Sequence, residues 1–193
     1  MGTTRFDSAY VINVLADDHP GIVAAVGNAV SELGGNIDSC SQTVLEGYFT
    51  LIMVISLPEP IESDQLASQV RELAQEGTNL QVMARVLDPV EESPPEGSER
   101  FVLTAFGQDR PGFLLGFSRY LAGKDINIVD LFGRCTDGEF TLISQVDVPA
   151  RYDVRLLQAD LEAMGSAGGF NVKFQHENVF VATNQLRLTS QRD

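Results

Sequence analysis

The chain has 193 residues, of which 44% are hydrophobic, and carries a net charge of −14 at pH 7 with a pI near 4.4. Binding to a nucleic-acid backbone needs a cationic face that releases counterions, so this charge argues against direct nucleic-acid binding. The sequence holds no apolar run of the roughly 18–20 residues that would cross a membrane, and residues 1–7 lack the apolar core of a signal peptide. We therefore expect a soluble cytoplasmic protein.

Two segments of the chain repeat each other. Residues 10–58 and 101–149 align without a gap at an offset of 91 residues and are identical at 12 of 49 positions, where average composition gives about three by chance. The identities include turn residues as well as strand residues, so duplication is the simplest account.

This repeat predicts two small domains, because each copy occupies about 80–90 residues. We place them at 1–88 and 100–180, joined by a linker at 89–99 and followed by a tail at 181–193. Domains of this size gain stability by packing on each other, so we expect a paired assembly, of which a homodimer is one form.

Each copy opens with a strand, a turn and a helix. Residues 10–16 and 101–107 are continuous apolar runs bounded by turn residues, as central strands are, and each leads into the motif Asp-x-Pro-Gly. Proline suits the first helical position because its φ is already set and it leaves no amide unpaired, so we expect helices to begin at Pro20 and Pro111. The apolar stripes that follow at helical spacing are Ile22, Val26, Ala29, Val30 and Leu33, and Phe113, Phe117, Tyr120 and Leu121.

A hairpin and a second helix come next in each copy. Residues 36–46 and 47–57 read as strands joined at Glu46-Gly47, and the second copy has Asp137-Gly138, a signal for a tight turn with positive φ. Helical spacing then predicts a helix that ends at Gly77 in the first copy and at Gly165 in the second. The positions that set this spacing are Leu66, Val70 and Leu73, and Val154, Leu157, Leu161 and Met164.

A strand of alternating apolar residues closes each copy, at 80–86 and at 170–175. The order βαββαβ, present twice, predicts an α+β protein of two ferredoxin-like domains, each a four-stranded antiparallel sheet with two helices on one face. The stretch between the copies is acidic, contains several prolines and is expected to be extended. The tail from Ala182 is polar, and we expect order there only where it packs on a domain.

Residue patterns typical of catalysis or metal binding are missing. Cys40 and Cys135 occupy non-equivalent positions and form no Cys-x-x-Cys pair, so we expect each to be a small buried residue in a strand. The two histidines, His19 and His176, fit no metal-binding spacing, and there is no nucleophile elbow or phosphate-binding glycine loop. We expect no enzyme activity, no metal and no cofactor.

The Asp-x-Pro-Gly turns are the candidate binding sites. A helix start offers unpaired amides and a partial positive charge to a carboxylate, and the glycine lets a ligand come close. Asp and Asn oxygens can accept from an ammonium group, so together these groups suit a free amino acid, which carries both charges on one carbon. The candidate residues are Asp18, His19, Gly21 and Asn36 in the first copy, and Asp109, Arg110, Gly112 and Asn127 in the second.

The same residues are also ordinary turn and helix-capping residues, and His19 equally suits a capping or solvent-exposed position. A module whose turns bind nothing, and whose sheet edges mediate dimerisation or partner docking, therefore stays open as the alternative.

These motifs resemble those of the ACT domain family, a ferredoxin-like regulatory module that commonly binds amino acids. The resemblance rests in both copies on the Asp-x-Pro-Gly turn, the asparagine fifteen residues after its glycine, and Gly-x-Phe-Thr-Leu at the third strand, and it extends from about Ala9 to His176. Asp-Asp-His-Pro-Gly-Ile, Gly-Gly-Asn-Ile-Asp-Ser and Gly-Tyr-Phe-Thr-Leu-Ile-Met are more narrowly similar to the tandem ACT repressors of the glycine cleavage system.

The resemblance implies a non-enzymatic regulatory protein that binds a small amino acid, with glycine as a candidate, and alters its contacts with a regulatory partner protein. Ligand sites in the family lie where the first turn of one domain meets the second strand of another. This implies ligand contacts at Asp18, Gly21 and Asn36, and at Asp109, Gly112 and Asn127. The narrower similarity implies an effect on transcription through a DNA-binding partner.

Serine specificity does not carry over from the resemblance. Serine-binding ACT domains have Asn where this chain has Asp18 and Asp109, and His where it has Ala16 and Gly107. A carboxylate beside the ligand's own carboxylate would repel it, so the Asp must face the ammonium group or serve the helix.

Overall fold

The structure is a computed structural model that describes residues 4–74, 79–88 and 97–189, with backbone alone for 184–189. The chain divides into two compact units, residues 1–92 and 93–193, which we call repeat 1 and repeat 2. The division falls within the predicted linker, most of which lies outside the described residues.

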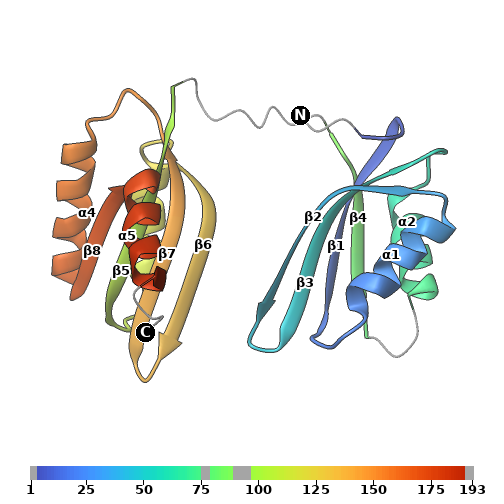
Figure 1. The fold of residues 1–193 in the computed structure, drawn as a ribbon, viewed down its shortest axis with the longest axis horizontal. Coiled ribbons are helices and arrows are strands. Elements are labelled where there is room, and N and C mark those ends of the chain that lie inside the picture. Colours follow the sequence, from blue (N-terminus) through green and yellow to red (C-terminus); the bar gives the residue numbers. More distant parts are fainter. Residues whose placement is uncertain (1–3, 75–78, 89–96, 190–193) are drawn as a thin grey trace. The chain divides into compact units, whose positions relative to one another are not determined.

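Both repeats have the element order βαββαβ (Figure 1). Repeat 1 contains β1 (Ser8–Asp17), α1 (Ile22–Glu32), β2 (Asn36–Leu45), β3 (Tyr48–Leu57), α2 (Ser63–Leu73) and β4 (Gln81–Val86). Repeat 2 contains β5 (Glu99–Gln108), α3 (Phe113–Ala122), β6 (Asn127–Thr136), β7 (Glu139–Val148), α4 (Val154–Gly168) and β8 (Phe170–His176), and α5 (Glu177–Thr189) follows it. Glu99, predicted as the last linker residue, is therefore the first residue of β5.

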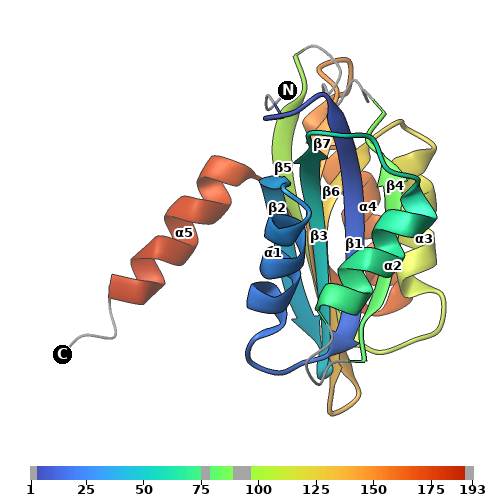
Figure 2. The same cartoon turned by 90° about the vertical axis from the view of Figure 1, so that its right-hand side faces the viewer.

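Each repeat folds into a four-stranded antiparallel sheet, in the order β2-β3-β1-β4 and β6-β7-β5-β8. In repeat 1, α1 and α2 lie over the same face of the sheet (Figure 2). The prediction of two ferredoxin-like α+β domains is confirmed. Among the described helices, none is long and apolar enough to cross a membrane.

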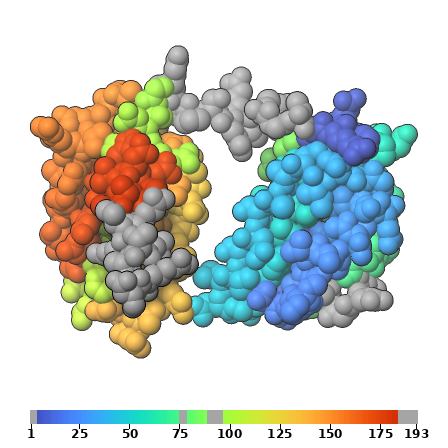
Figure 3. Space-filling model, viewed as in Figure 1, coloured from blue at the N-terminus to red at the C-terminus, as the bar shows by residue number. Residues whose placement is uncertain are grey.

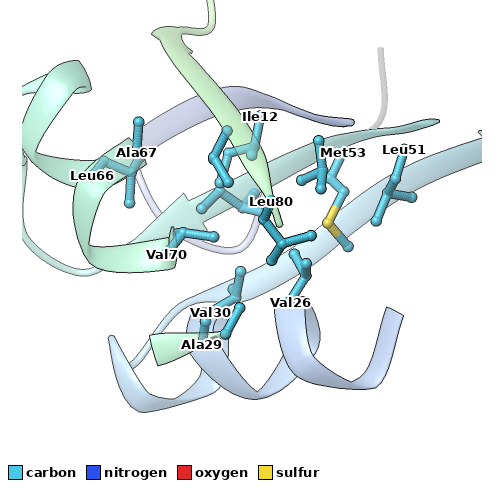
Figure 4. Close-up of a cluster of buried hydrophobic side chains, with 14 of the residues drawn as sticks. Ile12, Val26, Ala29, Val30, Leu51, Met53, Leu66, Ala67, Val70 and Leu80 are labelled. Carbon is cyan, nitrogen blue, oxygen red and sulfur yellow. The ribbon is translucent and has the colours of Figure 1, made fainter. Parts of the chain in front are cut away.

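The core of repeat 1 lies between its helices and one face of the sheet. Val26, Ala29 and Val30 of α1 and residues of α2 point toward the helix-facing side of β1 and β3 (Figure 4). Strand residues alternate in burial because successive side chains point to opposite faces, so Ile12 and Val14 are fully buried. Burying one such side chain contributes about 1.5–3 kcal/mol relative to leaving it exposed.

Tight turns join the hairpin strands where the sequence predicts them. Glu46 and Gly47 both have positive φ, at 50° and 83°, and Asp137 and Gly138 repeat this at 53° and 81°. Two consecutive residues with positive φ give a turn whose twist matches that of the strands, which fixes the register of β2 on β3. In the space-filling view of Figure 3, atoms of α1 and β2, in blue and cyan, make up much of the visible face of repeat 1.

Several expected boundaries differ from the structure. Helices α1 and α3 begin at Ile22 and Phe113, two residues after the prolines, because the glycine between them takes the N-cap position. Helix α2 ends at Leu73, and Gly77 lies outside the described residues. Helix α4 continues past Gly165, which is buried, and ends before Gly169, which has φ of 81°.

Two further expectations were wrong. Cys40 and Cys135 lie in strands as predicted, but both are exposed, because edge strands β2 and β6 are only partly covered by helices. Residues 177–189 form α5, so the predicted boundary between 180 and 181 falls inside a helix. The backbone amide of Asn178 donates to His176 Nδ1 at 3.2 Å, and this bond holds the start of α5 to the end of β8.

Candidate functional site

The turn between β1 and α1 is tied to the neighbouring hairpin. The amide of Asp18 donates to the carbonyl oxygen of Gly47 at 2.8 Å, and that of Asp109 donates to Gly138 at 2.9 Å. Because both repeats make this bond, the Asp-x-Pro-Gly turn lies at the same end of the sheet as the β2–β3 hairpin in repeat 1 and the β6–β7 hairpin in repeat 2.

Gly21 and Gly112 are required by backbone conformation. Their φ values are 104° and 87°, a region that costs other residues roughly 1–2 kcal/mol. A Cβ atom built on either glycine would meet no atom within 4 Å, so crowding is not the reason for glycine here. The space in front of each helix start is open enough for a ligand to approach the backbone.

The first amides of α1 have no side-chain cap. The first helical hydrogen bond runs from the amide of Ala25 to the carbonyl oxygen of Gly21 at 2.9 Å, and no side chain bonds to the amides before it. Asp18 therefore does not serve the helix as its capping group. Unpaired amides at a helix start carry a partial positive charge and favour a carboxylate or phosphate group.

An open pocket of about 730 Å³ lies at this turn in repeat 1. It is lined by Asp18, His19, residues 20–24, Gln42 of β2 and Phe49 of β3. Of the predicted residues of repeat 1, the structure brings Asp18, His19 and Gly21 together in this pocket. Phe49 forms an apolar wall, and its side chain is only 3% exposed.

Gln42 and Phe49 also line the pocket, although the sequence motifs did not indicate them. The turn at Glu46-Gly47 sets the register that pairs Gln42 with Leu51, and Leu51 faces the helices. Strand alternation therefore places Gln42 on the helix-facing side of β2. The signal was present in the sequence, but it becomes useful only once the hairpin register is known.

His19 and Arg110 stand at equivalent positions and have different surroundings. His19 is half-buried, and its Nδ1 lies 3.0 Å from the carbonyl oxygen of Pro20, to which it donates when that nitrogen carries the proton. Arg110 lies beside the end of α4, since a Cβ built on Gly169 would be 3.5 Å from its Cζ. A cation there interacts favourably with the carbonyl end of the helix dipole.

Asn36 and Asn127 lie at the opposite end of their sheets from the turns. Asn36 pairs with Ser56, and Ser56 with Ala9, eight residues before Asp17 along β1. At about 3.4 Å per residue, roughly 27 Å separate the two ends. A single repeat therefore does not bring Asp18 and Asn36 into one pocket, and the register of Asn127 with Asp147 gives the same separation from Asp109.

Asn36 bonds to its own repeat. Its side-chain nitrogen donates to Asp38 Oδ1 at 2.8 Å, and the backbone amide of Arg5 donates to the same oxygen at 3.0 Å. Asp38 is the extra residue of a bulge between Ile37 and Ser39, and β6 has its bulge at the equivalent position. A structural role for Asn36 is thus visible within repeat 1, while a ligand contact with a second domain stays a prediction.

Shifted pKa values occur away from the turns, among the described groups. Burial, followed by a hydrogen bond to Asp160, raises the pKa of Tyr120 well above its ordinary value. The hydrogen bond to Asp147 raises the pKa of Arg100. Both groups belong to repeat 2, and no three metal-ligating side chains converge among the residues described.

Two ferredoxin-like domains in tandem, with an open turn ahead of the first helix, define the class of fold. A family model for the ACT domain matches residues 8–85 and 99–175, so it covers both repeats. The chain belongs to the ACT domain family. This domain is typical of regulatory proteins that bind amino acids.

Curated relatives match about one repeat of this chain. UPF0237 proteins of Methanosarcina acetivorans and Methanocaldococcus jannaschii are 36% and 38% identical over 84 and 82 residues. These matches cover 43% and 42% of this chain and 91% of each relative. Each relative is therefore little longer than a single repeat.

Two solved structures match most of the chain. An unknown protein of Galdieria sulphuraria has a TM-score of 0.67 and 22% identity, with 88% of this chain and 98% of that one covered. A protein provisionally named a glycine cleavage system transcriptional repressor has a TM-score of 0.60 and 21% identity, with the same coverage. Both share the tandem fold.

Proposed function

We propose that this is a non-enzymatic regulatory protein that binds a small amino acid at the turn before α1 and signals its presence to a partner protein. One observation carries the proposal. Asp18 and the first residues of α1, whose amides have no side-chain cap, line the same open pocket. The pocket thus offers an acceptor for an ammonium group and donors for a carboxylate.

The charge of repeat 1 favours a zwitterion over a simple anion. Residues 1–92 contain 3 Lys and Arg against 14 Asp and Glu, a net charge of −11. A phosphate or dicarboxylate would be repelled by this field and by Asp18. An amino acid is neutral overall, and it can direct its ammonium group to Asp18 while its carboxylate faces the helix amides.

We extend the proposal to glycine as a candidate ligand and to a transcription regulator as the partner. Support comes from the provisional name of one structural neighbour that shares the tandem fold. The acidic surface suits contact with a protein, and it opposes direct contact with nucleic acid. Ligand binding can shift such a contact only if the ligand binds one state of the protein better than the other.

A thermal-shift panel of free amino acids on the full chain tests the proposal. A ligand at 100 times its Kd stabilises the protein by about 2.7 kcal/mol, so a bound amino acid raises the Tm. We expect Asp18→Ala to reduce that shift. Asp17→Ala is the matched control, because Asp17 is the neighbouring exposed acid, makes the same charge change and does not line the pocket.

Two results would reject this proposal. The first is a panel in which no amino acid raises the Tm. The second is an equal loss of the shift in both variants, which would point to net charge and not to the pocket.

A docking module remains the second candidate function, and a specific observation favours it. On the sheet face away from the helices, both repeats keep exposed apolar residues at equivalent positions. Leu15 and Phe106 are 38% and 49% exposed, and Ile52 and Ile143 are 48% and 36% exposed. If Leu15→Ser with Phe106→Ser abolishes self-association in sedimentation experiments and no amino acid shifts the Tm, this second candidate is favoured.

A further inference from the structure

We infer that the two turns are not equivalent: amino-acid binding is confined to repeat 1, where Gln42 is a specificity-determining contact, whereas in repeat 2 an aromatic ring occupies the space that corresponds to Gln42. This inference rests on the proposed function, and it adds which copy binds and which side chain distinguishes it.

Three apolar positions beneath the turn differ between the repeats. The offset of 91 residues identifies equivalent positions in the helices and makes Leu15 equivalent to Phe106. Gln81 pairs with Leu15 and Asn171 pairs with Phe106, so Gln81 corresponds to Asn171, and Leu80 to Phe170. Phe49 and Phe140 are the same in both copies. Ile22, Val26 and Leu80 in repeat 1 correspond to Phe113, Phe117 and Phe170 in repeat 2.

The aromatic residues of repeat 2 pack on one another around Phe113. Its ring stacks on Phe170 with centroids 3.4 Å apart, and it meets Phe117 and Phe140 edge-on at 4.6 and 5.9 Å. Phe113 is the first residue of α3, so the helix start itself rests on this cluster. Aromatic pairs in such geometries contribute about 0.5–1.5 kcal/mol beyond the area they bury, which stabilises this cluster.

The strand beside the pocket also differs, at Gln42 and its counterpart Gly133. A Cβ built on Gly133 would lie 2.9 Å from Cζ of Phe140, closer than real Cβ atoms come to a neighbour. The ring of Phe140 therefore lies where the side chain of Gln42 begins in repeat 1. Repeat 2 has neither the carboxamide nor the space for it.

Helix α3 also starts without a side-chain cap, but its first amide and the neighbouring cation Arg110 have contacts within repeat 2. The amide of Phe113 donates to the carbonyl oxygen of Arg110 in a long hydrogen bond of 3.4 Å. The guanidinium of Arg110 lies beside the end of α4. Gln42, in contrast, is exposed, lines the pocket, and can donate to a carboxylate or accept from an ammonium group.

Equilibrium dialysis of the full chain against radiolabelled glycine, alanine and serine tests the inference. We expect one bound amino acid per chain. Gln42→Ala should weaken binding about 2- to 10-fold, which corresponds to one hydrogen bond of about 0.5–1.5 kcal/mol. Gln42→Glu keeps the shape of the side chain but removes its donors, and it should weaken binding to a similar degree or more.

Matched controls separate the two copies and the two faces of β2. Thr43→Ala changes the next residue of β2, which points to the other face, and should leave the affinity unchanged. Asp109→Ala in repeat 2 should also leave it unchanged, whereas Asp18→Ala weakens it. Far-ultraviolet circular dichroism of every variant confirms that the fold is retained.

The possible outcomes distinguish this inference from the function it rests on. Two amino acids bound per chain, full affinity in both Gln42 variants, or loss of binding in Asp109→Ala would each overturn the inference while leaving amino-acid binding intact. No uptake of any of the three amino acids, together with a flat thermal-shift panel, would reject the proposed function itself.

Discussion

Repeat 1 and repeat 2 share the same backbone fold but differ in the side chains that pack beneath the Asp-x-Pro-Gly turn. Both turn the chain at Asp-x-Pro-Gly with a glycine at positive φ, and both bond that turn to the adjacent hairpin. Beneath the turn, repeat 1 has aliphatic residues beside an open pocket, and repeat 2 has stacked phenylalanines. After a duplication, backbone geometry constrains the turn residues, while core side chains change freely as long as they fill the space.

Electrostatics separates the repeats as well. Residues 93–193 contain 10 Lys and Arg against 13 Asp and Glu, a net charge of −3, compared with −11 for residues 1–92. The ion pairs found among the described residues, Arg100 with Asp147 and Arg151 with Asp125, both lie in repeat 2. Repeat 1 thus has an excess of negative charge around its pocket, whereas the positive and negative charges of repeat 2 nearly balance.

The largest expected effect concerns the aromatic cluster. Phe170→Ala should destabilise repeat 2 by about 3–5 kcal/mol, because it removes a buried ring that stacks on Phe113. Phe170→Leu, which installs the residue found at Leu80, should cost markedly less. Hydrogen–deuterium exchange read separately over each repeat measures both, and a Phe170→Leu variant as stable as the parent chain would show that the ring stack contributes nothing specific.

A smaller effect is expected at Gly107, whose counterpart in repeat 1 is Ala16. A Cβ on Gly107 would lie 2.6 Å from the carbonyl oxygen of Gly169, so Gly107→Ala should destabilise repeat 2 by about 1–3 kcal/mol. The reverse change, Ala16→Gly, should cost repeat 1 only about 0.5–1 kcal/mol through backbone entropy. Denaturant unfolding followed by hydrogen exchange distinguishes the two, and a neutral Gly107→Ala would mean that β5 and the end of α4 can separate without cost.

The smallest expected effect is a stabilisation at the hairpin turns. Glu46 and Asp137 both have positive φ, and Asn tolerates this conformation better than Glu does. Glu46→Asn should therefore stabilise repeat 1 by up to about 1 kcal/mol, whereas Asp137→Asn should change repeat 2 very little. Thermal unfolding of both variants and of the parent chain measures these changes in stability. A loss of stability in Glu46→Asn would contradict the prediction.

Most of the fold could be predicted from the sequence, because its signals are local. Alternating apolar residues identified the strands, and Glu46-Gly47 and Asp137-Gly138 identified the hairpins, whose positive φ values the structure confirms. Helix boundaries were less accurate, since Pro20 and Gly21 are each compatible with more than one position at a helix start. Gly165 did not end α4, because a small residue was needed there for close packing against Val172.

The candidate site could be predicted only in part. Asp18, His19 and Gly21 are neighbours in the chain, so their meeting in one pocket followed from a local turn. Asn36 lies on the same repeat but at the far end of its sheet, and the sequence motif does not indicate how far it lies from Asp18. Gln42 and Phe49 line the pocket because of the register between the strands, and that register depends on pairing between segments distant in the sequence.

The sequence by itself determined the duplication, the order of strands and helices, and the two turns, because short-range sterics and apolar periodicity govern these features. Only the tertiary structure decided which residues surround each turn. Register and packing bring together side chains that are far apart in the chain, and these left a pocket beside Gln42 in repeat 1 and placed the ring of Phe140 over Gly133 in repeat 2. Space in a folded core is shared among all its side chains, so whether a pocket stays open depends on every residue that lines it.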